Sequence, residues 1–296
     1  MSSTDDAPDE SEESSSEPDT LALLAEFDDP ADLEPEVVAE VLERGELELV
    51  GRLTDASNLS LVARTSADGV RLACVYKPIR GERPLWDFPD GTLAEREYAA
   101  AVVARAAGWN CTPPTILRGG PLGTGMVQLW IEGTDSDSAV DLFTPAELPD
   151  GWLPVFRAVD EGGHPLVLAH ADEPRLALLA AFDLVVNNAD RKAGHILPVP
   201  DGPLLGVDHG LTMHTEDKLR TVLWGWAGTP LPAEAVEGLD RLHLALADTG
   251  ELTEELGGLL TQTEVGALRT RVEVLRASST YNEPPIGRSA IPWPPI

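Results

Sequence analysis

The amino-acid sequence predicts an α+β fold in which a small antiparallel sheet comes first and helices follow. Residues 46–79 alternate apolar and polar side chains in three runs separated by turn residues, as strands with one exposed face do. After residue 173, long segments with an apolar face predominate, which is typical of helices packed around a core. A chain of 296 residues, 43% of them hydrophobic, is long enough to bury such a core.

Each expected element has a local signal. Helices are predicted at 35–44, ended by Gly45, and at 92–107, where Thr92 and Glu95 fit a capping box and Gly108 fits the end. Strands are predicted at 46–53, 57–66, 70–79, 115–118 and 125–133. The second half is expected to be mainly helical, with helices at 173–188, 231–248, 252–260 and 263–278. A hairpin is predicted from strands at 195–199 and 204–208 around a Pro-Asp-Gly turn.

Composition divides the chain into four parts. Residues 1–19 are small, acidic or proline apart from Met1, so we expect a disordered acidic tail. Residues 20–133 form a first lobe that contains the sheet and N-terminal helices, and residues 134–280 form a helical second lobe. Residues 281–296 are rich in proline and are expected to form an irregular C-terminal tail.

The charge of the chain excludes several classes of partner. A formal net charge of -30 repels phosphate backbones, so we expect no binding to nucleic acid. No run approaches the ~20 apolar residues that cross a bilayer, and no signal peptide is apparent, so no membrane insertion is expected. Cys74 and Cys111 lie in apolar settings, which favours buried, reduced thiols and a cytoplasmic location.

The segment NNADRKAGHILPVPDGPLLGVDHG, residues 187–210, concentrates charged side chains around the predicted hairpin. Pairing its two strands brings Asp190 and His195 close to Asp208. Two carboxylates and an imidazole then meet at one mouth of the hairpin. Kinases use this arrangement for the catalytic base and the metal ligands.

The order and spacing of these residues resemble the phosphatidylinositol 3-/4-kinase catalytic fold. More narrowly, the chain is similar to a group of bacterial phosphatidylinositol-kinase-related proteins. In that superfamily an Asp-Arg pair begins the catalytic loop, a metal-binding residue follows five positions later, and an Asp-x-Gly motif ends the hairpin. The matching positions here are Asp190-Arg191, His195 and Asp208-His209-Gly210. The resemblance covers roughly residues 45–245.

The resemblance implies a two-lobed protein-kinase-like fold and an ATP-dependent phosphotransferase. Asp190 is then the catalytic residue, and His195 with Asp208 holds Mg²⁺ or Mn²⁺ beside the nucleotide. Lys77, at the end of the third strand, binds the phosphates of ATP. Its partner is expected to be Glu97 on the following helix, because Glu95 is already assigned to the capping box.

Four further residues are candidates for binding ATP. Trp130 and Ile131 fall where the last strand of the sheet leads to the second lobe, where the nucleotide base is expected. Ser57 and Asn58 lie in the turn between the first two strands, where a phosphate-covering loop belongs. This turn lacks a G-x-G-x-x-G pattern, so a plain hairpin turn is an equal alternative.

The substrate and the activity stay open on sequence grounds. The family usually has Asn at the position of His195, and imidazole suits softer metals than Mg²⁺. His195 therefore binds Mn²⁺, hydrogen-bonds a phosphate, or marks lost metal binding. The expected substrate is an unidentified hydroxyl-bearing protein or small molecule. The alternatives are a catalytically inactive nucleotide-binding pseudokinase or scaffold, and an enzyme that transfers AMP from the same site.

Overall fold

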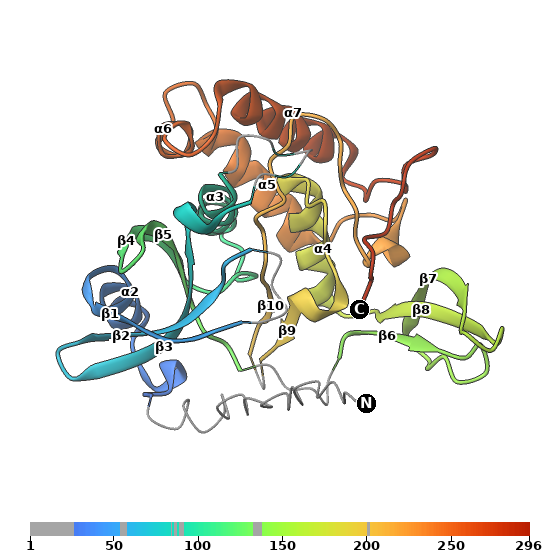
Figure 1. Ribbon diagram of the computed structural model, residues 1–296. Helices are drawn as coiled ribbons and strands as arrows, with labels where there is room; N and C mark the ends of the chain where they lie inside the picture. The colour runs from blue at the N-terminus through green and yellow to red at the C-terminus, as the bar shows by residue number, and fades with distance from the viewer. Residues whose placement is uncertain are drawn as a thin grey trace, which may run out of the picture.

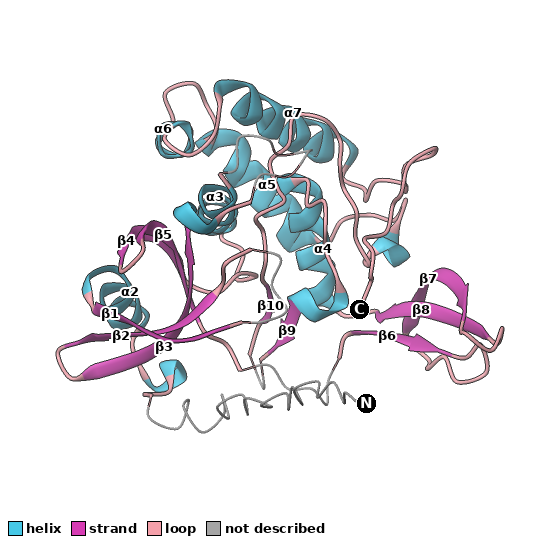
Figure 2. Cartoon of the chain, in the orientation of Figure 1, coloured by secondary structure: helices cyan, strands magenta, loops and turns pink. Residues whose placement is uncertain are grey.

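The computed structural model describes residues 27–53, 58–83, 85, 88, 92–132, 138–199 and 202–296. The expected acidic tail at 1–19, the apolar run that begins at Leu21, and Ser57 lie outside these residues. The described part is an α+β structure with three antiparallel sheets (Figures 1 and 2). In the described ranges, no helix is both long and apolar enough to cross a membrane.

The first sheet has five antiparallel strands in the order β1-β2-β3-β5-β4. Its strands are β1 (Glu46–Arg52), β2 (Leu61–Ala67), β3 (Val70–Pro78), β4 (Thr115–Gly120) and β5 (Gly123–Leu129). The predicted strands are confirmed, and two helices accompany the sheet. These are α2 (Pro35–Arg44) and α3 (Leu93–Ala107).

Helix α2 covers one face of this sheet. Its apolar side chains form a core cluster with Leu72, Cys74 and Tyr76 of β3. Because successive side chains of a strand point to opposite faces, Lys77 of β3 projects from the other face. That alternation aims the lysine away from α2.

The start of α3 differs from the predicted capping box. Thr92 has a φ of 61° and makes no capping hydrogen bond, because this backbone conformation turns its hydroxyl toward Arg96 Nε, 3.1 Å away. The free N–H groups of Leu93 and Ala94 donate instead to the carboxylate of Glu82, at 3.0 and 2.7 Å. The cap therefore comes from a residue outside the helix. The predicted end at Gly108 is confirmed, with a φ of 70°.

Helix α4 lies at the centre of the second half. Its residues 176–186 are all buried, and apart from Asp183 they belong to one large core cluster with residues of α3 and of the later helices. The predicted helices and hairpin are confirmed. Their bounds are α4 (Pro174–Val186), β9 (Ile196–Pro198), β10 (Leu204–Gly206), α5 (Ala233–Ala245), α6 (Glu251–Gly257) and α7 (Gln262–Ser278). Short 3₁₀ turns occupy Pro30–Asp32, Ile79–Gly81, Ala193–His195 and Trp224–Trp226.

A separate sheet of three strands was not predicted. It pairs in the order β6-β8-β7, and it lies at the opposite end of the molecule from β1–β5 (Figure 1). Its strands are β6 (Val140–Phe143), β7 (Trp152–Val159) and β8 (Pro165–Ala171). The expectation of a mainly helical second half is therefore wrong for residues 140–171. A register shift between Pro154 and Phe156 interrupts the alternation that would have identified β7.

The C-terminal residues are irregular, as predicted, but they pack against the body of the protein. The carbonyl of Ala290 accepts from the backbone N–H of Thr221 and from the indole N–H of Trp224. The carbonyl of Pro295 accepts from the N–H of Ala193 at 2.9 Å. The tail therefore reaches the loop that carries Asp190. Both cysteines are buried and free, as predicted.

Candidate functional site

Three charged side chains from distant segments, those of Lys77, Glu97 and Asp208, contact one another through the Lys77 ammonium. The Lys77 ammonium donates to both carboxylate oxygens of Glu97 at 3.0 Å and to Oδ1 of Asp208 at 2.9 Å. Lys77 comes from β3, Glu97 from α3, and Asp208 from the segment after β10. The predicted pairing of Lys77 with Glu97 is thus present in the structure. We call these three residues together with His195 the Lys77 cluster.

The exposed fraction of the side chains increases across the cluster from Glu97 to Lys77 to Asp208. The Glu97 side chain is 2% exposed, Lys77 is 21% exposed, and Asp208 is 51% exposed. Burial alone would lower the pKa of Lys77, but the carboxylates of Asp208 and Glu97 outweigh it and raise that pKa. The Lys77 charge holds the pKa of Asp208 well below its usual range. Burial raises the pKa of Glu97, and the Lys77 ammonium opposes that rise.

Glycine and a left-handed turn place Asp208 at the mouth of the hairpin. Asp208 has a φ of 59°, a conformation that aspartate tolerates better than most residues. Two positions before it, a Cβ on Gly206 would lie 2.7 Å from Leu179 and 2.8 Å from the guanidinium of Arg191. Only glycine allows β10 to pass this close to α4 and to Arg191.

His195 faces the outer oxygen of Asp208. Its Nε2 lies 3.4 Å from Asp208 Oδ2, whereas Oδ1 of that carboxylate is bound by Lys77. Burial lowers the pKa of His195 to about 4, so its ring is neutral at pH 7. Its Nδ1 is buried and has no hydrogen-bond partner among the described residues. In the tautomer with the proton on Nδ1, Nε2 carries the lone pair and presents it beside Asp208 Oδ2.

The donor set at His195 and Asp208 fits a cation that also binds phosphate. Within the described ranges, no three His, Cys, Asp or Glu side chains are grouped closely enough to hold a metal alone. Mg²⁺ is commonly held by one or two protein ligands together with substrate phosphates. An imidazole nitrogen beside a carboxylate also suits Mn²⁺. The Asp208 oxygen and the His195 nitrogen are therefore sufficient protein ligands for a cation only when phosphate oxygens complete its coordination shell.

Asp190 lies in the loop between α4 and β9 and is paired with Lys192. The Lys192 ammonium is 3.3 Å from Oδ2 of Asp190. The backbone N–H of Asp190 donates to the side-chain oxygen of Asn188 at 3.0 Å. Burial raises the pKa of Asp190, and the positive charge of Lys192 opposes that rise. A carboxylate of raised basicity is suited to accept a proton.

A fully buried ion pair holds this loop. The Arg191 guanidinium binds both carboxylate oxygens of Asp183 in α4 at 2.9 Å. Its Nη1 donates to the carbonyls of His195 and Val207, and its Nη2 lies 2.6 Å from His209 Nε2. One guanidinium therefore fixes the loop, the hairpin and α4 together. His209 is buried in this contact.

A second buried ion pair positions α3. The Arg96 guanidinium binds Glu264 Oε1 in α7 and donates to the carbonyl of Thr212 at 2.9 Å. Arg96 precedes Glu97 in the chain, so this contact anchors the turn of α3 that carries the partner of Lys77. Sequence reasoning missed Asp183 and Glu264. Their partners are separated from them by 8 and 168 positions.

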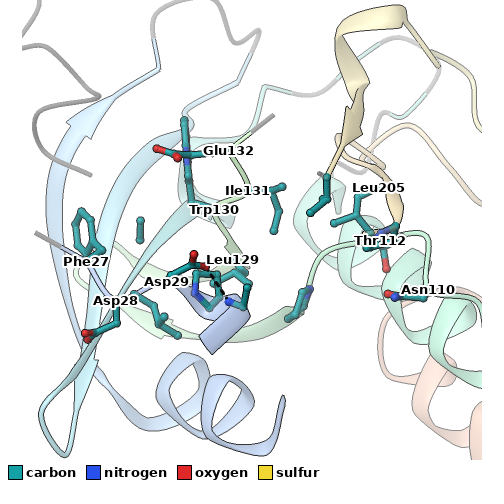
Figure 3. Close-up of a pocket in the computed structure, with 17 residues that line it drawn as sticks. Phe27, Asp28, Asp29, Asn110, Thr112, Leu129, Trp130, Ile131, Glu132 and Leu205 are labelled. Atoms are coloured by element: carbon teal, nitrogen blue, oxygen red, sulfur yellow. Dashed lines mark hydrogen bonds between the residues drawn. The ribbon is translucent and has the colours of Figure 1, made fainter. Parts of the chain in front are cut away.

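The four remaining candidates lie apart from Lys77 or outside the described residues. Trp130 and Ile131 line a cavity of about 730 Å³ together with Leu72, Leu129 and Asn110, among others (Figure 3). The same cavity is also lined by Ala73 of β3 and by Leu205 of β10, so it reaches the hairpin that precedes Asp208.

Asn58 accepts a hydrogen bond from the N–H of Arg83 at 2.9 Å, so its side-chain oxygen is already used. Ser57 lies outside the described residues. The structure thus brings together Lys77, Glu97, His195 and Asp208, and it places Asp190 in the adjoining loop.

The fold and the site define an α+β protein with a charged site between β3, α3 and the β9–β10 hairpin. No family model matches the chain. The chain is 49% identical over 268 residues to Protein Rv2133c of Mycobacterium tuberculosis (strain ATCC 25618 / H37Rv), a match that covers 86% of this chain and 94% of that protein. The chain belongs to the same family as Rv2133c.

Proposed function

We propose that the protein is an ATP-dependent phosphotransferase with a two-lobed protein-kinase-like fold, which transfers the γ-phosphoryl group of ATP to a hydroxyl. The observation that carries the proposal is the Lys77 ammonium, which contacts both Glu97 and Asp208. A strand lysine held by a helix glutamate, beside an Asp-x-Gly aspartate, is the arrangement that phosphoryl transfer uses. Here three separate segments supply these groups.

Each residue of the Lys77 cluster has a separate role. Glu97, almost fully buried, holds the Lys77 ammonium in place, and Lys77 binds the phosphates of ATP. Asp208 and neutral His195 hold a divalent cation, Mg²⁺ or Mn²⁺. When bound, this cation neutralises negative charge on the β- and γ-phosphates. The Asp208 oxygen that Lys77 occupies becomes available when the ammonium turns to the phosphate.

Asp190 orients the attacking hydroxyl and accepts its proton. The Asn188 side chain and the buried Arg191–Asp183 pair hold its backbone, so the carboxylate is positioned before substrate arrives. Its raised pKa increases its strength as a base relative to an exposed aspartate. Most of the rate enhancement then comes from positioning and charge neutralisation.

The test is transfer of label from ATP that is labelled at the γ- or the α-phosphate, with Mg²⁺ or Mn²⁺ present. We expect γ-label to move, and Asp208→Asn to reduce this transfer about 10³-fold. Asp150→Asn, at an exposed position, is the matched control and retains full activity. Movement of the α-label would identify an AMP transferase instead. Binding of nucleotide with neither label moving would identify a pseudokinase.

A further inference from the structure

Arg220 lies alongside the loop that carries Asp190. Its backbone N–H donates to the carbonyl of Asn188 at 3.0 Å, and its own carbonyl accepts from the N–H of Arg191 at 3.0 Å. These two hydrogen bonds flank Asp190 on both sides. The neighbouring residue, Thr221, forms a parallel bridge with Arg191. Arg220 is therefore fixed next to the proposed catalytic residue by its backbone.

The guanidinium of Arg220 makes no hydrogen bond or ion pair in the described part of the chain, although it is half-buried. Other arginines there also lack a side-chain partner, but each of those is exposed, namely Arg52, Arg71, Arg80, Arg83 and Arg157. An exposed guanidinium is satisfied by water. A half-buried one loses part of its hydration without compensation, and this favours a bound anion.

The charges around Asp190 include a cation that forms no ion pair. In the Lys77 cluster one ammonium faces two carboxylates and a neutral imidazole, which leaves a site for a cation. At Asp190, burial raises the pKa of the carboxylate, Lys192 lowers it, the Asp208 carboxylate raises it, and Arg220 lowers it. Lys192 forms an ion pair with Asp190, whereas Arg220 forms none in the described residues. We call Asp190, Lys192 and Arg220 the Asp190 cluster.

We propose that the acceptor carries an anionic group, a phosphate or a carboxylate, close to the hydroxyl that is phosphorylated, and that Arg220 with Lys192 binds that group. This inference rests on the proposed function and names the substrate class of the same site. A guanidinium binds phosphate or carboxylate through two parallel hydrogen bonds, so it orients the acceptor as well as attracting it. The neighbouring hydroxyl is then held at Asp190.

The reaction balances without a further reactant. The acceptor oxygen forms a bond to the γ-phosphorus of ATP, and the bond from that phosphorus to the bridging oxygen of ADP breaks. The electron pair of that bond leaves with ADP. The hydroxyl proton passes to the carboxylate of Asp190. Arg220 and Lys192 keep their protons throughout and act only on the anionic group.

The same chemistry could come from a soluble metabolite or from a lipid headgroup. The net charge of -30 opposes approach to an anionic bilayer, which attracts basic rather than acidic surfaces. We therefore expect a soluble anionic acceptor. Vesicles of phosphatidylglycerol provide the lipid arm of the test, because that headgroup joins a phosphodiester to free hydroxyls.

The experiment measures binding of inorganic phosphate to the full chain saturated with a non-hydrolysable ATP analogue, so that the α-, β- and γ-phosphate positions are filled. Titration calorimetry compares the wild type with Arg220→Gln and Arg220→Lys. Arg157→Gln, which changes an exposed arginine of β7, is the matched control. We expect Arg220→Gln to weaken phosphate binding roughly tenfold or more, since a hydrogen bond to a charged group contributes that much. Arg220→Lys should recover part of the loss.

The outcomes separate the two proposals. Phosphate binding that Arg220→Gln weakens and Arg157→Gln does not supports the anionic acceptor. Equal binding by both variants, or no phosphate binding by a wild type that binds the ATP analogue, overturns it and leaves the phosphotransferase intact. Failure to bind the ATP analogue overturns the proposed function itself. Binding to phosphatidylglycerol vesicles that exceeds binding to phosphate would overturn the soluble acceptor in favour of a lipid.

Discussion

The Lys77 cluster and the Asp190 cluster use charge in opposite ways. At Lys77 the ammonium is bound on both sides by carboxylates, and the deepest of these, on Glu97, is 2% exposed. At Asp190 the single carboxylate has one paired cation, Lys192, and a second cation, Arg220, that is unpaired. The first cluster has two carboxylates for one ammonium, and the second contains a guanidinium without an ion-pair partner in the described residues. We infer that one is built for a metal-bound nucleotide and the other for an anionic acceptor.

Substitution of the two aspartates gives the largest expected effect and tests this comparison directly. Asp208→Asn and Asp190→Asn should each lower the rate of γ-phosphoryl transfer about 10³-fold. Only Asp208→Asn should also weaken binding of ATP with Mn²⁺, because it removes a charge that faces the cation. Equilibrium binding of ATP measured beside the transfer rate checks this. Equal loss of nucleotide binding in both variants would contradict the separate roles.

The Arg191–Asp183 pair should dominate stability. Asp183→Asn leaves the Arg191 guanidinium fully buried without its counter-charge, which costs about 3–5 kcal/mol of unfolding free energy. Denaturant unfolding followed by fluorescence measures this loss. Asp240→Asn breaks an exposed pair with Arg276 and serves as the control, with an expected loss below about 1 kcal/mol. Comparable losses of unfolding free energy in both variants would show that the buried pair contributes no more to stability than an exposed pair.

Arg96 should affect activity through the position of Glu97. Arg96→Gln breaks its buried contact with Glu264, which frees α3 to shift and weakens the hold on Lys77. We expect about a tenfold fall in kcat with the fold retained, and partial recovery in Arg96→Lys. A circular dichroism spectrum checks folding, and the KM for ATP measured beside kcat locates the defect. If kcat falls only in proportion to the fraction of unfolded protein, Arg96 has no positioning role.

His170 should give the smallest effect, a pH dependence of stability. Its Nε2 accepts a hydrogen bond from the N–H of Gly225, and burial lowers its pKa below 6.5. The unfolded chain therefore binds this proton more readily than the folded protein. The free energy of unfolding should be constant above about pH 6.5 and fall as the pH decreases below it. His170→Gln should reduce this slope without abolishing it, because burial also lowers the pKa of His195 and of His209. His243→Gln on α5 should leave the slope unchanged.

Local patterns were sufficient to predict most of the elements and the core of the site. The order of Lys77, Asp190, His195 and Asp208 follows from short motifs, and the hairpin between the last two follows from its turn residues. The capping box at Thr92 failed because the backbone there adopts a φ of 61°, so Glu82 caps α3 from outside the helix. A local motif does not report a competing partner in the folded structure.

The contacts that support the site could not be predicted. Arg96 and Glu264 are 168 positions apart, and nothing near either residue indicates the other. Arg220 has no motif, and its relevance appears only when its backbone is found beside Asp190. The sheet of β6, β7 and β8 was missed because β6 has only four residues and a register shift interrupts β7. The ion pair of Arg96, the position of Arg220 and the third sheet all depend on contacts between segments that are distant in the sequence or carry no local signal.

A crystal structure with a non-hydrolysable ATP analogue and Mn²⁺ tests the central claim most directly, since manganese is located by its anomalous scattering. The account predicts manganese between Asp208 and His195, with the Lys77 ammonium moved from Asp208 to a phosphate oxygen and still bound to Glu97. A nucleotide bound away from these residues, or a Lys77–Asp208 contact that persists at 2.9 Å with the nucleotide present, would contradict it.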